Sequence, residues 1–465
     1  MPERRTDPLV ASREALDAAH RHSARYLAEV SGRRVAPDRA ARDALAGFDE
    51  PLPDGPSDPV DTLDLLDRLG SPATVASTGG RFFGLVVGGT LPAALGARAL
   101  ASAWDQVVFS DATSPVGVAL ERVAARWLLD VLGLPAGAAV GFTTGATVAN
   151  LTCLAAAREH LLARAGWNVN ERGLRGAPAL RVVAGAELHV TVRKALALLG
   201  IGTGAIETVA CDANGALDAT ALPTLDDRTL VLLQAGNVNS GACDPIGAIA
   251  ARATGTGAWL HVDGAFGLWA AASPRTRSLL DGHDGADSWV VDGHKWLNTP
   301  YDCGIAICRH PASLHEAMRT QAPYLEVGGH DPSRVAPKDM VPEFSRSARG
   351  VEVWAALRSL GRNGVAALIE WCCEHAQAFA AGLRALGFEV LNDVVLNQVV
   401  ATVPGREDRM AELAGAVQAS GEAWFGPTTW RGRPAIRLSV SSWATSEADV
   451  ERTLDAIGRA LADVG

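Results

Sequence analysis

The feature that most constrains this chain is a series of short, mostly apolar runs between residues 180 and 308. The runs are Leu180–Ala184, Ile206–Ala210, Leu230–Gln234, Trp259–Val262, Ser288–Val291 and Gly304–Cys308. Each run is too short for a helix and lacks the polar alternation of a half-exposed strand, so the pattern is typical of strands buried on both faces of a mostly parallel sheet. The runs alternate with helix-length segments. The sequence therefore predicts an α/β fold.

The flanking sequence divides the chain into three parts. Residues 1–75 carry apolar positions at helical spacing and then a run rich in proline and aspartate, which predicts an N-terminal helical arm and linker. Residues 76–365 hold the strand series and form the expected large domain. Residues 366–465 begin with a long helical pattern and continue with strands and a last helix from Ser446, which predicts a small C-terminal α+β domain.

Local signals place some boundaries. Ser114 before Pro115 predicts a helix N-cap followed by a first-turn proline, and Asp244 before Pro245 predicts the same arrangement. The uncharged stretch 131–157 has the length of a membrane span, but it contains a proline, several glycines, threonines and an asparagine. We interpret it as interior loop and helix, and we expect no membrane association.

Composition narrows the kinds of partner and the compartment. Lysine and arginine total 42 against 52 acidic residues, a formal charge of −10, and no basic run could follow a phosphate backbone, so nucleic acid is not an expected partner. The seven cysteines show no CxxC spacing, which argues against a zinc ribbon or a disulfide framework. The first residues carry no apolar secretory segment. A cytoplasmic protein with a small-molecule ligand is expected.

Lysine is scarce, and one lysine has a special position. Of Lys194, Lys295 and Lys338, only Lys295 follows directly after a predicted buried strand, at the edge where open α/β sheets bind ligands. A buried amine there can attack a carbonyl to form an imine. A structural lysine at a strand end remains the alternative.

A second feature is the segment 261–265, where strand alternation places His261 and Asp263 on one face. A carboxylate at the end of an interior strand needs a partner, because burying it unpaired costs several kcal/mol. A protonated heterocycle, a metal or an arginine would each serve, and the residues alone do not choose between them.

Two further features lie upstream. The small-residue loop 141–150 runs into an apolar helix, and its free backbone N–H groups with the hydroxyl of Thr147 suit a phosphate, although threonine is also a common N-cap. His189 stands between a predicted strand and a predicted helix, where its ring either stacks on a flat cofactor or caps the helix.

Taken in order, the loop, His189, Asp263 and Lys295, which follows Asp263 by 32 positions, resemble the group II pyridoxal-phosphate (PLP) decarboxylases of the aromatic-amino-acid, histidine and glutamate type. The resemblance covers roughly residues 75–445 and is sharpest in segments 261–265, 292–297 and 301–303. It implies PLP fold type I, the aspartate-aminotransferase-like α/β fold with a mostly parallel central sheet and a smaller C-terminal α+β domain.

The resemblance also implies the cofactor, the reaction and the roles of the residues. The expected reaction is decarboxylation of an L-amino acid to the amine and CO2. Lys295 is expected to hold PLP as an internal aldimine, Asp263 to pair with the pyridinium nitrogen, and His189 to lie over the ring face. Residues expected to contact the phosphate or the ring substituents are Gly145, Ala146, Thr147, His294 and Asn237. The family is dimeric, so a homodimer is expected, with the N-terminal arm packed on the partner.

The sequence departs from the family at one expected catalytic position. Family decarboxylases usually carry a tyrosine in a mobile loop, and alignment on Trp354 places that position near Pro337. The candidate replacements are Tyr324, His330 and Lys338. Segment 80–87 is less aromatic than the resemblance suggests for an indole or catechol substrate, so the substrate stays open.

Three other functions were weighed. An aminotransferase or an oxidative, aldehyde-forming enzyme would keep the cofactor and change the reaction. A metal hydrolase would use His261, Asp263 and His294, but the sequence lacks the His-x-x-x-His spacing, or another regular spacing, that would supply a third metal ligand. A catalytically inactive scaffold conflicts with the intact lysine and aspartate. Arg437 is a further candidate for holding a substrate carboxylate.

Overall fold

The central feature of the computed structural model, which describes residues 7–204, 206–320 and 335–463, is a seven-stranded sheet in the order β1-β7-β6-β5-β4-β2-β3. The strands are β1 (Ala139–Thr143), β2 (Arg181–Gly185), β3 (Ile206–Val209), β4 (Thr229–Gln234), β5 (Trp259–Asp263), β6 (Ser288–Asp292) and β7 (Gly304–Cys308). Only β7 runs antiparallel to its neighbours, β1 and β6. The mostly parallel α/β sheet is confirmed.

All six apolar runs form strands, but the sequence missed β1. The predicted loop and helix over 131–157 is wrong in part, because Ala139–Thr143 forms a strand that pairs with β7 at the edge of the sheet. Small and polar residues such as Gly141 hid the strand pattern. Gly141 is required by packing, since an added Cβ would lie 2.7 Å from the carbonyl oxygen of Met340.

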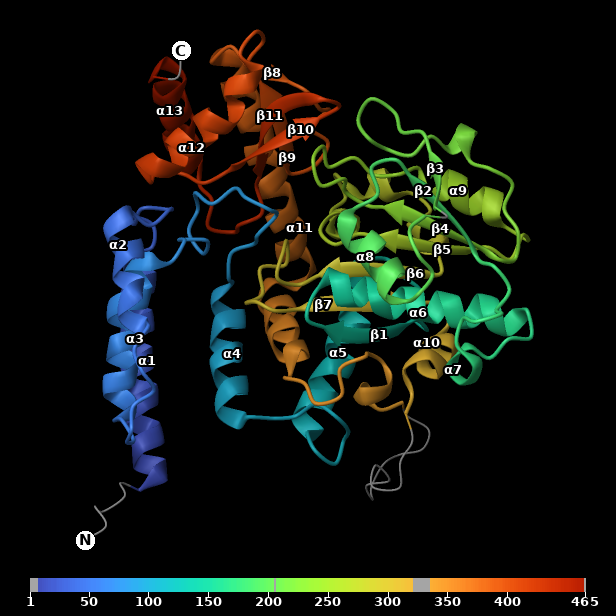
Figure 1. Cartoon of the computed structure of the whole chain (residues 1–465), viewed down its shortest axis with the longest axis horizontal. Coiled ribbons are helices and arrows are strands. Elements are labelled where there is room, and N and C mark those ends of the chain that lie inside the picture. The colour runs from blue at the N-terminus through green and yellow to red at the C-terminus, as the bar shows by residue number, and fades with distance from the viewer. Residues whose placement is uncertain (1–6, 205, 321–334, 464–465) are drawn as a thin grey trace.

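Helices cover both faces of the sheet (Figure 1). One face packs against α6 (Ala146–Arg164), α8 (Val190–Leu198) and α10 (Pro311–Met318) through side chains such as Leu230 and Leu232. The alternate side chains, Val231 and Leu233, point into the core formed with α5 (Pro115–Val131), α9 (Ile246–Ala253) and α11 (Arg349–Ala385). This two-sided burial explains why the strand runs lack polar alternation.

One of the two predicted helix caps is confirmed and the other is wrong. The Ser114 hydroxyl accepts a hydrogen bond from the Gly117 amide at 3.2 Å at the start of α5. Asp244 does not cap α9. Its buried carboxylate instead accepts hydrogen bonds from the amides of Leu217 and Gln234, both at 2.7 Å. These two bonds tie the segment after β4 to a neighbouring loop.

The C-terminal part contains a second, antiparallel sheet in the order β10-β11-β9-β8. It comprises β8 (Glu389–Val390), β9 (Gln398–Thr402), β10 (Gly426–Trp430) and β11 (Arg433–Ser439), with α12 (Met410–Ser420) and α13 (Glu447–Asp463) beside it. Helix α11 connects the two sheets and bends at Gly361, where φ is +61°. The predicted boundary at residues 365/366 therefore falls inside α11, and the division into domains stays a prediction.

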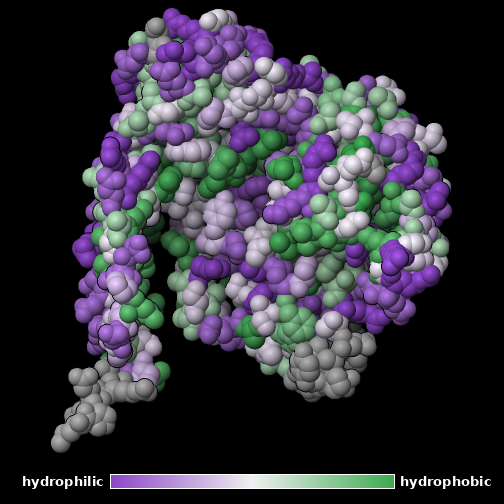
Figure 2. Space-filling model, in the orientation of Figure 1, coloured by the Kyte–Doolittle hydropathy of each residue, from purple (hydrophilic) through white to green (hydrophobic). Residues whose placement is uncertain are grey.

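The N-terminal arm consists of α1 (Pro8–Glu29), α2 (Arg39–Asp43) and α3 (Pro59–Ala73), and it stands beside the body, with α4 (Pro92–Trp104) across a gap (Figure 1). The arm meets the C-terminal part near α12, where the Val35 amide donates to the Gly421 carbonyl at 2.8 Å. Figure 2 shows the surface hollowed between the arm and the body, with apolar residues along the hollow. No helix in the described ranges has the length and apolar character needed to cross a membrane.

Candidate active site

Lys295 lies just beyond β6, at the carboxyl edge of the sheet, as expected. Its Nζ is 3.1 Å from Oδ2 of Asp292, the last residue of β6, whose side chain is 2% exposed. The second oxygen of Asp292 is buried and has no hydrogen-bond partner among the described residues. Asp292 was not among the predicted site residues, although it stands in the motif that singled out Lys295.

A glycine-rich segment lies directly against this lysine. A Cβ added at Gly88 would be 1.8 Å from the Lys295 carbonyl oxygen, so the segment 84–89 fits only because residue 88 has no side chain. In the same segment, Leu85 and Val86 have positive φ angles of 56° and 57°. Bulky residues rarely adopt this conformation, and such strain concentrates at functional sites.

Asp263 ends β5, next to β6 in the sheet, and its side-chain neighbours are neutral. Its Oδ1 accepts from the Ala265 amide at 3.2 Å, and its Oδ2 accepts from Nδ2 of Asn150 at 3.3 Å. The predicted common face with His261 is confirmed through Asn150, whose Oδ1 lies 2.7 Å from Nε2 of His261. A carboxylate that is 6% exposed and bonded only to amides has room for a cationic partner.

His189 performs one of its two expected tasks and is placed for the other. As the N-cap of α8, it accepts a hydrogen bond at Nδ1 from the Thr191 amide at 3.4 Å. Burial lowers the pKa of His189, and the charges of Asp263 and Lys295 act on it in opposite directions. The capped helix therefore directs His189 toward the two principal site residues, while its stacking on a ring stays a prediction.

The predicted phosphate loop lies beside the lysine segment. Gly145 is the N-cap of α6, and a Cβ added to it would be 3.2 Å from Cε1 of His294. The first amides of α6, including those of Ala146 and Thr147, have no acceptor within the helix, and the helix dipole adds positive potential there. Nδ1 of His294 accepts from the Cys303 amide at 3.0 Å, which fixes the ring, and burial lowers its pKa.

Asn237 has a structural task that the sequence did not reveal. Its Oδ1 accepts from the amides of Asn239 and Ser240, at 2.8 and 3.2 Å, and so holds a turn after β4. Its Nδ2 is buried and has no partner among the described residues. A contact with the ring substituents of a cofactor stays a prediction.

Of the candidate replacements for the loop tyrosine, only Lys338 lies among the described residues. Lys338 is held by Asp339, with Nζ to oxygen distances of 2.7 and 2.8 Å. Tyr324 and His330 lie outside the described residues. Arg437 is half-buried, donates to the Val238 carbonyl at 3.1 Å, and its charge acts on His189. This puts Arg437 near the site, as the sequence suggested.

The three residues weighed as metal ligands do not form a metal site. Nε2 of His261 bonds to Asn150 and its Nδ1 lies 2.8 Å from Ser288 Oγ, so both ring nitrogens are already engaged. Within the part of the chain that the structure describes, no three histidine, cysteine or acidic side chains are grouped for a metal ion.

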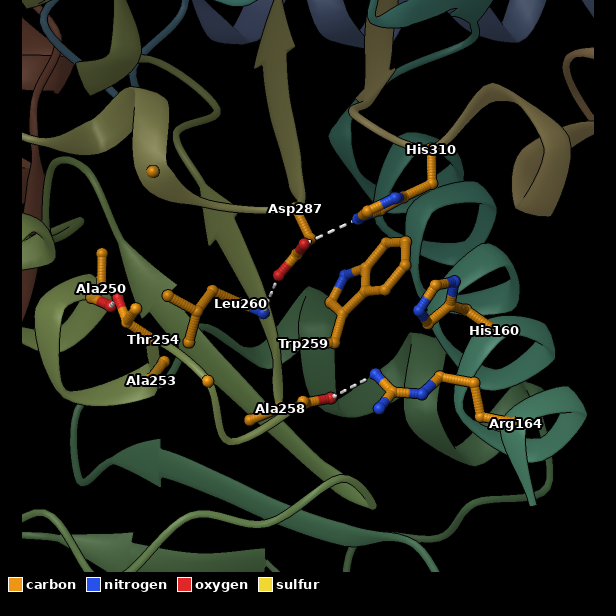
Figure 3. A pocket seen from close by; sticks show the side chains of 13 residues that line it. His160, Arg164, Ala250, Ala253, Thr254, Ala258, Trp259, Leu260, Asp287 and His310 are labelled. Atoms are coloured by element: carbon orange, nitrogen blue, oxygen red, sulfur yellow. Dashed lines mark hydrogen bonds and ion pairs between the residues drawn. The ribbon is translucent and has the colours of Figure 1, made fainter.

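A cavity of about 250 Å3 opens at the opposite edge of the sheet, where β5 and β6 begin (Figure 3). Two of its polar side chains are paired, since His310 Nε2 lies 2.7 Å from Asp287 Oδ1, and His160 Nδ1 lies 3.0 Å from Ser313 Oγ. The indole of Trp259 lines it, with the rings of His160 and His310 about 5 Å away. The cavity is thus separate from the lysine site.

The site fits pyridoxal phosphate. It offers an amine beside a strand end, a buried carboxylate that accepts from neutral amides, and a helix N-terminus next to a fixed imidazole. The buried Oδ1 of Asp292, which has no hydrogen-bond partner among the described residues, leaves an acceptor for a group bound at this site. The fold and this set of groups define a PLP-dependent enzyme of fold type I.

Comparison with known proteins gives the family. The sequence profile of the pyridoxal-dependent decarboxylase conserved domain matches residues 68–403, so the chain belongs to the pyridoxal-dependent decarboxylases and is a carboxy-lyase by family. The expected cofactor and reaction type are confirmed.

Individual proteins agree with this assignment. The chain is 30% identical to an L-2,4-diaminobutyrate decarboxylase of Rhizobium meliloti, over 78% of this chain and 74% of that protein. It is 27% identical to a phenylacetaldehyde synthase of Arabidopsis thaliana, over 86% of both. Among solved structures, Oryza sativa TDC with PLP and tryptamine superposes with a TM-score of 0.90 at 25% identity and covers 99% of both chains.

Proposed function

We propose that this chain decarboxylates an L-amino acid with PLP bound covalently to Lys295. The observation that carries the proposal is the placement of Lys295 and Asp263 at the carboxyl ends of the adjacent strands β6 and β5, where the charges of both act on His189. When bound, the cofactor supplies an electron-withdrawing ring that accepts the electron pair left when the carboxylate departs as CO2.

The residues of the chain then have distinct tasks. Asp263 offers the ring nitrogen a buried carboxylate that already receives two N–H groups. The α6 N-terminus, with Gly145, Ala146 and Thr147, and the His294 ring bind the phosphate. His189 packs on the ring face, and Asn237 lies near the ring substituents. Arg437, whose charge acts on His189, is the candidate for orienting a substrate carboxylate.

We further propose a homodimer in the cytoplasm. Helices α1, α3 and α4 expose large apolar side chains, among them Leu16, Leu66, Leu100 and Trp104. Figure 2 shows apolar residues along the hollow between the arm and the body. Covering such a surface with a second copy removes apolar area from water. The free cysteines, three of which are only partly buried, suit a reducing compartment.

Borohydride reduction of the PLP-loaded protein, followed by peptide mass spectrometry, tests the proposal. We expect the tag on Lys295, with loss of the tag and of all turnover in Lys295→Ala. Lys194→Ala, which changes an exposed lysine of α8, is the matched control and should behave like the wild type. A tag on another lysine, or turnover by Lys295→Ala, would refute the assignment.

A second candidate function is an oxidative reaction on the same fold. It is favoured by the lack of a tyrosine near Pro337 and by the similarity to a phenylacetaldehyde synthase. In that reaction, amino acid, O2 and water give aldehyde, CO2, ammonia and hydrogen peroxide. A panel of tryptophan, tyrosine, phenylalanine and 2,4-diaminobutyrate, assayed with and without oxygen, separates the two functions: amine formation that is independent of oxygen supports simple decarboxylation, and peroxide with ammonia supports the alternative.

A further inference from the structure

Four buried side chains form a continuous hydrogen-bonded chain that ends at Asp263. Along β5, residues 259, 261 and 263 point to the same face of the sheet, toward α6. Ser288 is the residue of β6 paired with His261, and Asn150 lies in the second turn of α6. Trp259 is 1% exposed, and Ser288, His261 and Asn150 are fully buried.

The distances link these side chains one after another. Trp259 Nε1 lies 2.9 Å from Ser288 Oγ, which lies 2.8 Å from His261 Nδ1. His261 Nε2 lies 2.7 Å from Asn150 Oδ1, and Asn150 Nδ2 lies 3.3 Å from Asp263 Oδ2. The chain thus runs along one face of the sheet, from the Trp259 indole in the wall of the Figure 3 cavity to the carboxylate at the opposite edge.

The chemistry of the end groups fixes the direction of each bond. A carboxylate only accepts, so Asn150 must present its NH2 group to Asp263 and its oxygen to His261. His261 then donates from Nε2. Burial lowers the pKa of His261 to about 4, so the ring is neutral and its Nδ1 accepts. Ser288 therefore donates to Nδ1 and accepts from Trp259, whose indole N–H can only donate.

We infer that Asn150, His261, Ser288 and Trp259 form a directional relay that positions Asp263 for the pyridine nitrogen of the cofactor, with Asn150 as its last positioning residue. Every bond donates toward Asp263, and chained hydrogen bonds of one direction polarise each other. Oδ2 of Asp263 is therefore held by the polarised N–H group of Asn150. The carboxylate can still accept one further hydrogen bond, from the pyridine nitrogen of the cofactor. The inference rests on the proposed role of Asp263.

The test uses the PLP-loaded enzyme and graded variants along the relay. Asn150→Leu removes the contact with Asp263, Ser288→Ala breaks the middle of the relay, and Trp259→Phe removes only the terminal N–H. Trp289→Phe is the matched control, since Trp289 is a fully buried tryptophan of β6 whose N–H donates to the His283 carbonyl, outside the relay.

Two measurements on bound cofactor distinguish positioning from general damage. One is the dissociation constant of PLP, and the other is the pH midpoint of its visible absorbance. A proton on the pyridine nitrogen of the cofactor makes the Lys295 nitrogen to which the cofactor is attached lose its own proton more easily. If Asp263 holds that pyridine proton less tightly, the pH midpoint of the absorbance should therefore move upward. We expect about tenfold weaker PLP binding and an upward midpoint in Asn150→Leu, smaller shifts of the same sign in Ser288→Ala and Trp259→Phe, and no midpoint shift in Trp289→Phe.

The relay is overturned if the midpoint of Asn150→Leu equals that of the wild type, or if Trp289→Phe shifts it as much as Trp259→Phe does. Should Asn150→Leu not fold, the other variants carry the same comparison. Nitrogen-15 NMR of the cofactor-free protein reports which nitrogen of His261 carries the proton, and the signal lost in His261→Gln assigns the resonance. A neutral ring protonated at Nε2 supports the relay, whereas a ring protonated at Nδ1 refutes it. Wild-type protein that carries no cofactor on Lys295 would refute the proposed function instead, so the two failures are distinguishable.

Discussion

Lys295 Nζ is paired with Asp292 Oδ2 at 3.1 Å, and both residues belong to the turn that closes β6. The amine that we propose binds the cofactor is therefore held by a buried carboxylate three positions before it in the chain. This contact must break before the nitrogen can attack an aldehyde.

Replacing Asp292 by asparagine should speed the attachment of PLP to the cofactor-free protein. The variant replaces the ion pair with a weaker neutral contact but keeps the size of the side chain. We expect the visible absorbance to grow several times faster at pH 7, as measured by stopped-flow mixing. Asp302→Asn, which removes an exposed partner of Arg349, serves as control and should leave the rate unchanged. A slower reaction in Asp292→Asn would show that the carboxylate assists attachment.

Gly88→Ala should abolish PLP attachment, because the added Cβ would lie 1.8 Å from the Lys295 carbonyl and the backbone of the turn must move. Gly96→Ala is the matched control. Gly96 lies in α4 with no atom within 4 Å of its added Cβ, so alanine there should raise stability by about 0.5–1 kcal/mol. Absorbance spectra and thermal unfolding read both effects; a Gly88→Ala protein with normal cofactor absorbance would contradict the packing argument.

His261 should make folding stability depend on pH. The pKa of His261 is 6.5 in the unfolded chain and about 4 in the folded protein, so between these pH values the unfolded chain binds more protons. The free energy of unfolding that the neutral ring contributes is therefore complete above pH 6.5 and is lost as the pH falls toward 4. Between pH 7.5 and pH 5 this amounts to about 2 kcal/mol. Urea titration at pH 7.5 and pH 5 measures the free energy of unfolding of the wild type and of His261→Gln. The advantage of the wild type over the variant should be smaller at pH 5 by about 2 kcal/mol. A constant difference would mean that the ring is charged in the folded protein.

The buried ion pair of Glu121 and Arg346 should be costly to break from one side. The guanidinium binds both carboxylate oxygens, with Nη2 to Oε2 at 2.8 Å, and joins α5 to the segment before α11. Glu121→Ala leaves an unpaired buried arginine and should lower the free energy of unfolding by about 3–5 kcal/mol. The double variant Glu121→Leu/Arg346→Met should recover most of this loss in the same urea titration. If it is no more stable than Glu121→Ala, packing at Gly350, rather than the charge, explains the loss.

The local patterns predicted six of the seven strands of the central sheet and the position of Lys295 and Asp263 at the ends of two of them. Runs such as Leu230–Gln234 were visible because burial on both faces demands apolar residues at every position. Strand β1 was missed since its small residues carry no such signal. Asp244 was assigned to a helix cap because its neighbour Pro245 permits one, whereas the acceptors needed by Leu217 and Gln234, far apart in sequence, decided its place.

The sequence by itself determined that Lys295 and Asp263 end buried strands, since the order of apolar runs and the residues after them are local properties. Only the tertiary structure decided which side chains join the hydrogen-bonded chain that ends at Asp263. Asn150, which contacts Asp263, and Ser288, which contacts His261, come from positions 113 residues before and 25 residues after Asp263, and hydrogen bonds between buried groups depend on packing across α6, β5 and β6. The polar Asn150 in an apolar helix was the one available signal. A single sequence does not show where such a residue points, because that follows from how the helix rests on the sheet.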